Sequence, residues 1–130
     1  MEKKIHQSPP FGQEISCVMK KINSEFLLDC EKLSVLLKSI LIKENFGILN
    51  FVSHNFEPKG FTIIALLSES HLAIHTYPEY NSIYFNMYSC RGPKDAKPTF
   101  DFLKNKLQPK EILFYEEKEI PVQDLNAHPH

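Results

Sequence analysis

The feature that most constrains the fold is one amphipathic helix that stands between strand-like segments. Apolar residues recur at steps of three and four from position 33 to position 41, with charged residues available for the opposite face. This spacing predicts a helix with one apolar face. Asp29 is a candidate N-cap, and Gly47 is a candidate terminator just after the helix. Because an apolar face must be buried, the helix requires a second layer.

Patterns typical of β-strands supply that second layer. Residues 14–22 and 47–53 are interpreted as strands, and residues 83–88 alternate apolar and polar side chains with a period of two. Residues 61–67 form a continuous apolar run, which is typical of a strand buried on both faces. The remaining expected elements are a strand from Leu72 up to Pro78, a helix with Pro98 in its first turn, and a strand at 112–115.

The expected order of elements is β-α-β-β-β-β-α-β. The economical architecture for this order is an α+β two-layer sandwich, a mainly antiparallel β-sheet with two helices packed on one face. The chain has 130 residues, which is enough for one hydrophobic core, so we predict a single domain over 1–130.

Composition excludes several classes of partner and site. The 15 Lys and Arg residues balance the 16 Asp and Glu residues without a long block of one sign, which argues against nucleic acid and membrane partners. No apolar run approaches a membrane span or a signal peptide, so we expect a cytoplasmic protein. Cys17, Cys30 and Cys90 are odd in number and widely spaced, which indicates neither a disulfide framework nor a thiolate zinc site.

The most informative segment is SESHLAIHTYPEY, which runs from Ser68 to Tyr80, and Cys90 follows twenty residues after Ser70. Its order of Glu-Ser-His, His-Thr, an aromatic residue and Pro-Glu closely resembles the prokaryotic S-adenosylmethionine decarboxylase family. The close resemblance covers about residues 56–91. Members of this family are pyruvoyl-dependent enzymes that process themselves, so the resemblance implies a lyase made as a zymogen.

The resemblance implies autocatalytic cleavage between Glu69 and Ser70. The products would be a β chain of residues 1–69 and an α chain of residues 70–130 that begins with a pyruvoyl group derived from Ser70. The Ser70 hydroxyl would attack the Glu69 carbonyl and replace the amide with an ester. An amide resists this attack, so donors must be aimed at the oxyanion, and Thr62 matches a family hydroxyl position that supports the step.

Further matches imply roles in elimination and turnover. His75 matches the base that takes the α proton of the esterified residue, which drives β-elimination toward pyruvoyl. The mature carbonyl would form a Schiff base with the substrate amine, so neither pyridoxal phosphate nor a metal is required. Cys90 matches the thiol that protonates the carbanion after decarboxylation. Decarboxylated S-adenosylmethionine is the aminopropyl donor for spermidine synthesis.

The resemblance also implies a substrate site and an assembly. Phe56 and Tyr77 match the aromatic pair that sandwiches the adenine of S-adenosylmethionine, and Glu79 matches the acceptor of its ribose hydroxyls. Relatives of this type are typically dimers of processed αβ units, with residues of both protomers near the active site. We therefore expect a homodimer.

Three departures from the family pattern leave alternatives open. Thr62 stands where serine is usual, Tyr77 stands where tryptophan is more common, and Gln13-Glu14 replaces a common Arg-His pair. An added carboxylate suits a guanidinium or ammonium tail, so arginine and ornithine are alternative substrates. An unprocessed regulatory paralogue is a third hypothesis, although a pseudoenzyme has no chemical need to keep its serine, histidine and cysteine.

The His71 and His75 pair also has a plainer interpretation. The H-x-x-x-H spacing would bring both rings to one face of a helix, where they would suit a metal. On a strand the same step separates them by about 13 Å. We therefore expect no metal site from this pair.

Overall fold

The computed structural model describes residues 6–124. Its elements are β1 (Phe11–Lys20), α1 (Ser24–Leu28), α2 (Cys30–Lys43), β2 (Ile48–Asn55), β3 (Phe61–Leu67), β4 (Ser70–Tyr77), a 3-10 turn (Pro78–Tyr80), β5 (Ser82–Ser89), α3 (Lys97–Leu107) and β6 (Glu111–Pro121). The strands form one antiparallel sheet in the order β2-β3-β4-β5-β1-β6. The predicted α+β sandwich is confirmed; the short helix α1 and the 3-10 turn were not anticipated.

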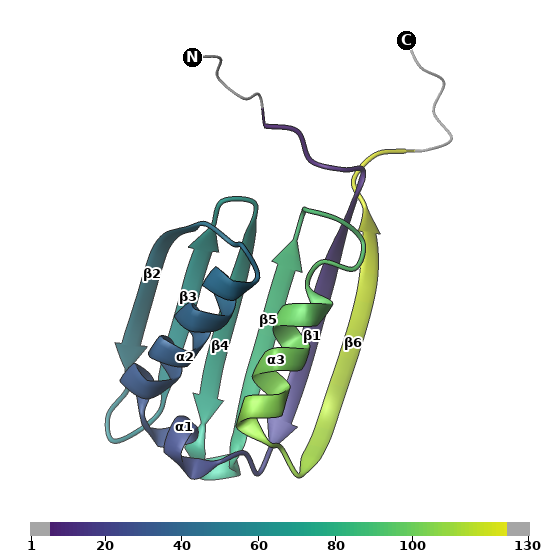
Figure 1. Ribbon diagram of the computed structural model, residues 1–130. Helices are drawn as coiled ribbons and strands as arrows, with labels where there is room; N and C mark the ends of the chain where they lie inside the picture. Colours follow the sequence, from purple (N-terminus) through teal and green to yellow (C-terminus); the bar gives the residue numbers. More distant parts are fainter. Residues whose placement is uncertain (1–5, 125–130) are drawn as a thin grey trace.

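The helices lie on one face of the sheet, and the other face is uncovered (Figure 1). Leu33, Leu37 and Leu41, from the predicted apolar face of α2, are fully buried. They join one core with inward-facing sheet residues such as Ile63 and Ile74. Burying each such side chain stabilises the fold by roughly 1.5–3 kcal/mol, so this layer contact dominates the stability of the domain.

The two ends of α2 test the predicted caps. The carboxylate of Asp29 accepts a hydrogen bond from the Lys32 amide at 3.0 Å, so the predicted N-cap is confirmed. The predicted terminator is wrong, because the helix ends at Lys43 and Asn45 takes the left-handed conformation with φ 63°. Gly47 has another role. A Cβ there would lie 2.2 Å from the Ser68 hydroxyl oxygen, so a larger residue would require this hydroxyl to move from its hydrogen bond with the Gly47 carbonyl, in the turn before Ser70.

The prediction that residues 61–67 are buried on both faces is wrong. Along β3 buried residues alternate with more exposed ones, and the side chains of Ile64 and Leu66 are 46% and 52% exposed. The helices cover only one face of the sheet, so a continuous apolar run here places half of its side chains on the uncovered face. That face therefore carries apolar residues without a covering layer.

None of the helices within residues 6–124 has the length and apolar character that a membrane crossing demands.

Candidate active site

The predicted site residues gather at the two opposite ends of β4. The turn before Ser70 lies at the same end of the sheet as the end of β5, and Tyr77 lies at the other end, beside the start of β3 (Figure 1). Ser70 and His75 are five residues apart on this extended strand, so they are separated by roughly 17 Å. One chain therefore holds two clusters, called here the Ser70 end (Glu69, Ser70, Cys90) and the His75 end (Phe56, Thr62, His75, Tyr77, Glu79).

The Ser70 end is assembled by the pairing of β4 with β5. Ser70 is in register with Ser89, so the preceding residue, Glu69, comes to lie beside Cys90. The Cys90 amide donates to the Glu69 carbonyl oxygen at 3.2 Å, and the Cys90 thiol donates to the same oxygen. The Ser70 hydroxyl oxygen is buried and has no hydrogen-bond partner within residues 6–124. The unpartnered Ser70 hydroxyl is thus adjacent in the chain to the Glu69 carbonyl, whose oxygen accepts two hydrogen bonds.

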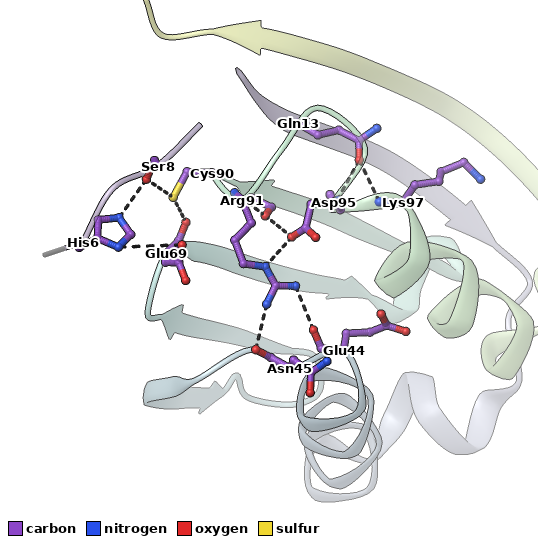
Figure 2. Close-up of polar contacts among 12 residues, drawn as sticks. His6, Ser8, Gln13, Glu44, Asn45, Glu69, Cys90, Arg91, Asp95 and Lys97 are labelled. Atoms are coloured by element: carbon purple, nitrogen blue, oxygen red, sulfur yellow. Dashed lines mark hydrogen bonds and ion pairs between the residues drawn. The ribbon is translucent and has the colours of Figure 1, made fainter. Parts of the chain in front are cut away.

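A chain segment upstream of β1 completes the Ser70 end. The Ser8 hydroxyl donates to Cys90 Sγ at 3.5 Å, and His6 Nε2 lies 2.9 Å from the Ser8 hydroxyl. His6 Nδ1 lies 4.0 Å from the Glu69 carboxylate. Figure 2 shows these four side chains directed toward one another. Sequence reasoning missed His6 and Ser8, because residues 1–11 carry little pattern and their neighbours are distant in sequence.

Arg91 fixes the loop that follows Cys90. Its Nε contacts an Asp95 carboxylate oxygen at 2.7 Å, and its two terminal nitrogens donate to the carbonyl oxygens of Glu44 and Asn45 at 2.9 Å each (Figure 2). These carbonyls follow the C-terminus of α2, where a positive charge is favoured. Arg91 therefore ties the loop to the helix layer and restrains the position of Cys90.

The His75 end is assembled by the pairing of β3 with β4. Thr62 is in register with His75, and Thr62 Oγ1 lies 3.1 Å from His75 Nδ1. A pocket of about 280 Å³ opens here. It is lined by Phe56, Lys59, Gly60, Thr62, His75, Thr76, Tyr77 and Glu79. All three residues predicted to bind substrate line one pocket, and Lys59 is a lining residue that the sequence did not indicate.

Gln13 lies in neither cluster. Its side chain is buried, and its Oε1 accepts from the amides of Ala96 and Lys97 at 2.8 and 2.9 Å (Figure 2). Its Nε2 donates to the Glu117 carboxylate at 2.7 Å. These amides belong to the start of α3, where helix donors lack intrahelical partners. The departure at Gln13 is therefore explained by capping of α3, and it does not shape the pocket at the His75 end.

The sequence and the fold of the chain are similar to those of known proteins. The family model described as S-adenosylmethionine decarboxylase matches residues 13–118. An S-adenosylmethionine decarboxylase proenzyme of Thermoplasma acidophilum is 35% identical over 94 residues, which cover 70% of each chain. One of Pyrobaculum arsenaticum is 36% identical over 95 residues, or 72% of this chain and 76% of its own. The crystal structure of the Aquifex aeolicus adenosylmethionine decarboxylase shares the fold, with a TM-score of 0.81, 23% identity, and coverage of 92% of this chain and 98% of that chain.

Proposed function

The chain belongs to the S-adenosylmethionine decarboxylase family, and from this premise we propose how its residues divide the work. It is the proenzyme of a carboxy-lyase that is pyruvoyl-dependent after self-processing and serves spermidine biosynthesis. We propose that it cuts itself between Glu69 and Ser70 into a β chain of residues 1–69 and an α chain of residues 70–130. The Ser70 end carries the bond that is cut and the proton donor for turnover, whereas the His75 end supplies the base for elimination and binds the substrate.

One observation carries the proposed cleavage, namely the two donors on the Glu69 carbonyl oxygen. When the Ser70 hydroxyl attacks the Glu69 carbonyl carbon, negative charge develops on this oxygen. The Cys90 amide and thiol already donate to it, as an oxyanion hole requires. The Ser70 hydroxyl is buried and has no hydrogen-bond partner among the described residues. Its oxygen is therefore not held by a competing contact that would oppose the attack on the Glu69 carbonyl carbon.

His75 is the proposed base for the elimination that follows. Thr62 bonds to Nδ1 of His75, which leaves Nε2 to take the α proton from the esterified residue 70. In this proposal Thr62 acts on processing through the orientation of His75. The sequence associated Thr62 with donation to the oxyanion. Within one chain, the donors to the Glu69 carbonyl oxygen are the amide and the thiol of Cys90.

The mature enzyme uses the same residues for turnover. When present, the pyruvoyl group supplies an electrophilic carbonyl that accepts the electrons left behind by carbon dioxide. The Cys90 thiol, adjacent to residue 70 through the β4–β5 register, then donates its proton to the substrate carbon. The proposed chemistry requires no pyridoxal phosphate and no metal.

The pocket at the His75 end suits the nucleoside of S-adenosylmethionine. Phe56 and Tyr77 offer aromatic faces to the adenine and to the sulfonium charge, and Glu79 offers a carboxylate to the ribose hydroxyls. The feature that favoured arginine or ornithine was the Gln13-Glu14 pair with its added carboxylate. Gln13 is occupied with the cap of α3, and Glu14 does not line this pocket. We therefore propose that substrate selection lies with Phe56, Tyr77 and Glu79.

We propose that the active unit is a homodimer, because each chain alone holds an incomplete site. His75 lies roughly 17 Å from Ser70 along β4, beyond the reach of a side chain. A twofold axis repeats every contact between two copies. If the Ser70 end of one copy contacts the His75 end of its partner, the reverse contact therefore forms as well. Each Ser70 end would then meet the His75 end of the other copy.

The uncovered face of the sheet is the proposed dimer interface. Val52, Ile64, Leu66 and Phe114 point to this face by strand alternation, and each is about half exposed in one chain. Exposed apolar groups of this extent mark interaction surfaces. A second sheet stacked on this face would bury them and bring the two ends of β4 together.

We also propose a cytoplasmic location. Cys17, Cys30 and Cys90 are all free thiols, and proton donation by Cys90 requires its reduced form. A reducing compartment preserves that form.

Two measurements test the proposed function. Intact mass of the denatured protein should give two fragments that meet at Glu69 and Ser70, and Ser70→Ala should remain a single chain. Release of labelled carbon dioxide should be found with S-adenosylmethionine and not with arginine or ornithine. A wild-type chain that stays uncut under conditions where it is folded would contradict the proposed self-processing.

A further inference from the structure

The segment before β1 is anchored beside Cys90. The Pro10 carbonyl accepts a hydrogen bond from the Val122 amide at 2.8 Å, which ties the segment to the end of β6. Ser8 is half-buried against Cys90, whereas His6 is exposed. These residues precede the region that the family model matches, so no role is assigned to them by the family.

Hydrogen bonds join His6 to Ser8 and Ser8 to Cys90, and the Glu69 carboxylate lies at ion-pair distance from His6. From solvent inward, the Glu69 carboxylate faces His6 Nδ1 at 4.0 Å, His6 Nε2 faces the Ser8 hydroxyl at 2.9 Å, and that hydroxyl donates to Cys90 Sγ at 3.5 Å. We propose that Ser8 and His6 are positioning residues that return a proton from solvent to Cys90 after each turnover. This inference rests on the proposed role of Cys90 as proton donor.

The proton balance of this route is simple. Each decarboxylation takes one proton from Cys90 Sγ and leaves a thiolate. The Ser8 hydroxyl passes its proton to that sulfur and receives one from protonated Nε2 of His6. His6, which lies 4.0 Å from the Glu69 carboxylate, then takes a proton from solvent. One proton moves from water to sulfur, and no electrons are transferred.

The other charged groups near Cys90 are engaged elsewhere. The Arg91 guanidinium points away, toward Asp95 and the carbonyls after α2 (Figure 2). Asp95 is shared between Arg91 and the Ser89 hydroxyl. Among the described residues, hydrogen bonds through Ser8 join the sulfur to the exposed His6, and the Glu69 carboxylate lies within 4.8 Å of the same sulfur.

The proposed cleavage makes this route pass between the two product chains. His6, Ser8 and Glu69 belong to residues 1–69, whereas Cys90 belongs to residues 70–130. The β chain would then contribute to turnover directly through His6 and Ser8, in addition to supplying three strands of the sheet.

The first test measures Cys90 itself, without a cofactor. In an uncut Ser70→Ala background, the alkylation rate of Cys90 by iodoacetamide is followed against pH by peptide mapping. Burial raises the pKa of the Cys17 thiol to about 11, so Cys17 stays unreactive at neutral pH. Ser8→Ala removes a donor to the thiolate and should move the midpoint of the profile up by about one pH unit. Ser8→Thr keeps the hydroxyl and should restore the midpoint. Gln7→Ala, exposed between the two residues, is the matched control.

The second test uses the processed enzyme. His6→Ala should lower kcat for S-adenosylmethionine by about tenfold without a change in KM, and added imidazole should restore the rate in proportion to its protonated fraction. Gln7→Ala should behave as wild type. Profiles of Ser8→Ala and His6→Ala that coincide with Gln7→Ala would overturn the relay, as would a loss that imidazole fails to rescue. Failure of the proposed function is distinguishable, because the wild-type enzyme would then release no carbon dioxide.

Discussion

The two ends of β4 are built in different ways. At the Ser70 end, the chemistry depends on backbone groups and on residues far apart in sequence, since Glu69 meets Cys90 and Ser8 through the β4–β5 register and the segment before β1. At the His75 end, it depends on neighbouring strands that line a pocket with side chains. One linear motif therefore holds residues of both ends, and strand β4 keeps the two ends apart. In the proposed dimer a partner copy unites them.

A complementation experiment gives the largest expected effect and tests whether each site combines the two ends from different copies. Cys90→Ala and His75→Ala should each reduce turnover by at least about a hundredfold as homodimers, because each removes a proton-transfer group. A heterodimer of the two variants, purified through two different tags, contains one intact site of two. It should recover about half of the wild-type rate if each site combines the Ser70 end of one copy with the His75 end of the other.

The control for this experiment places both changes in one chain. A heterodimer of the double variant with wild type has no intact site under the proposed arrangement and should be inactive. If that heterodimer kept half of the rate and the split heterodimer had none, each site would lie within one chain and the division would fail.

Much of the fold followed from the sequence because local patterns determined it. The steps of three and four in α2, the alternation in β5 and the N-cap at Asp29 each specify local structure that the tertiary contacts then reinforce. The end of α2 at Asn45 was missed because the left-handed residue need not be glycine. The exposed face of β3 was missed because an apolar run alone does not show how many layers cover a strand.

The site was predictable only in part, for a related reason. The motif identified Ser70, His75 and Cys90, yet linear spacing does not reveal that β4 separates the first two. His6 contacts Glu69, and Ser8 contacts Cys90. Each contact joins residues more than sixty positions apart in the sequence, and no local pattern encodes it. Family resemblance therefore named the candidate residues, and the strand register showed which of them lie close together.

Gln13→Ala tests the scaffold that both ends share. The change leaves two buried amides of α3 and the Glu117 carboxylate without their partner, which should lower the free energy of unfolding by about 2–3 kcal/mol. Calorimetry should show a melting temperature lower by several degrees. Cleavage and KM should stay unchanged at a temperature where the variant is folded. A change in substrate preference would instead return Gln13 to the substrate site.

Phe56→Ala should affect the His75 end alone. Loss of one aromatic face of the pocket should raise KM for S-adenosylmethionine by about tenfold, with little change in the extent of self-cleavage. Intact mass and steady-state kinetics on the same preparation separate the two effects. Phe46→Leu, at a buried ring beside Arg91 and outside the pocket, is a matched aromatic control that should leave KM unchanged. If self-cleavage decreased while KM increased, the two ends would not be independent.

Thr62→Ser gives the smallest expected effect and the finest test of how the two ends communicate. Serine keeps the hydroxyl on His75 Nδ1 and removes only a methyl group, so self-cleavage should become faster by no more than about threefold. Thr62→Val keeps the shape and removes the hydroxyl, so it should slow cleavage by about tenfold through a poorly oriented His75. The time course of cleavage after dilution from denaturant measures both. Thr62 and Ser70 lie at opposite ends of the β3–β4 pair within one chain. If the slowed cleavage of Thr62→Val is relieved in a heterodimer with Ser70→Ala, the Thr62 hydroxyl of one copy must act on the cleavage of the other copy.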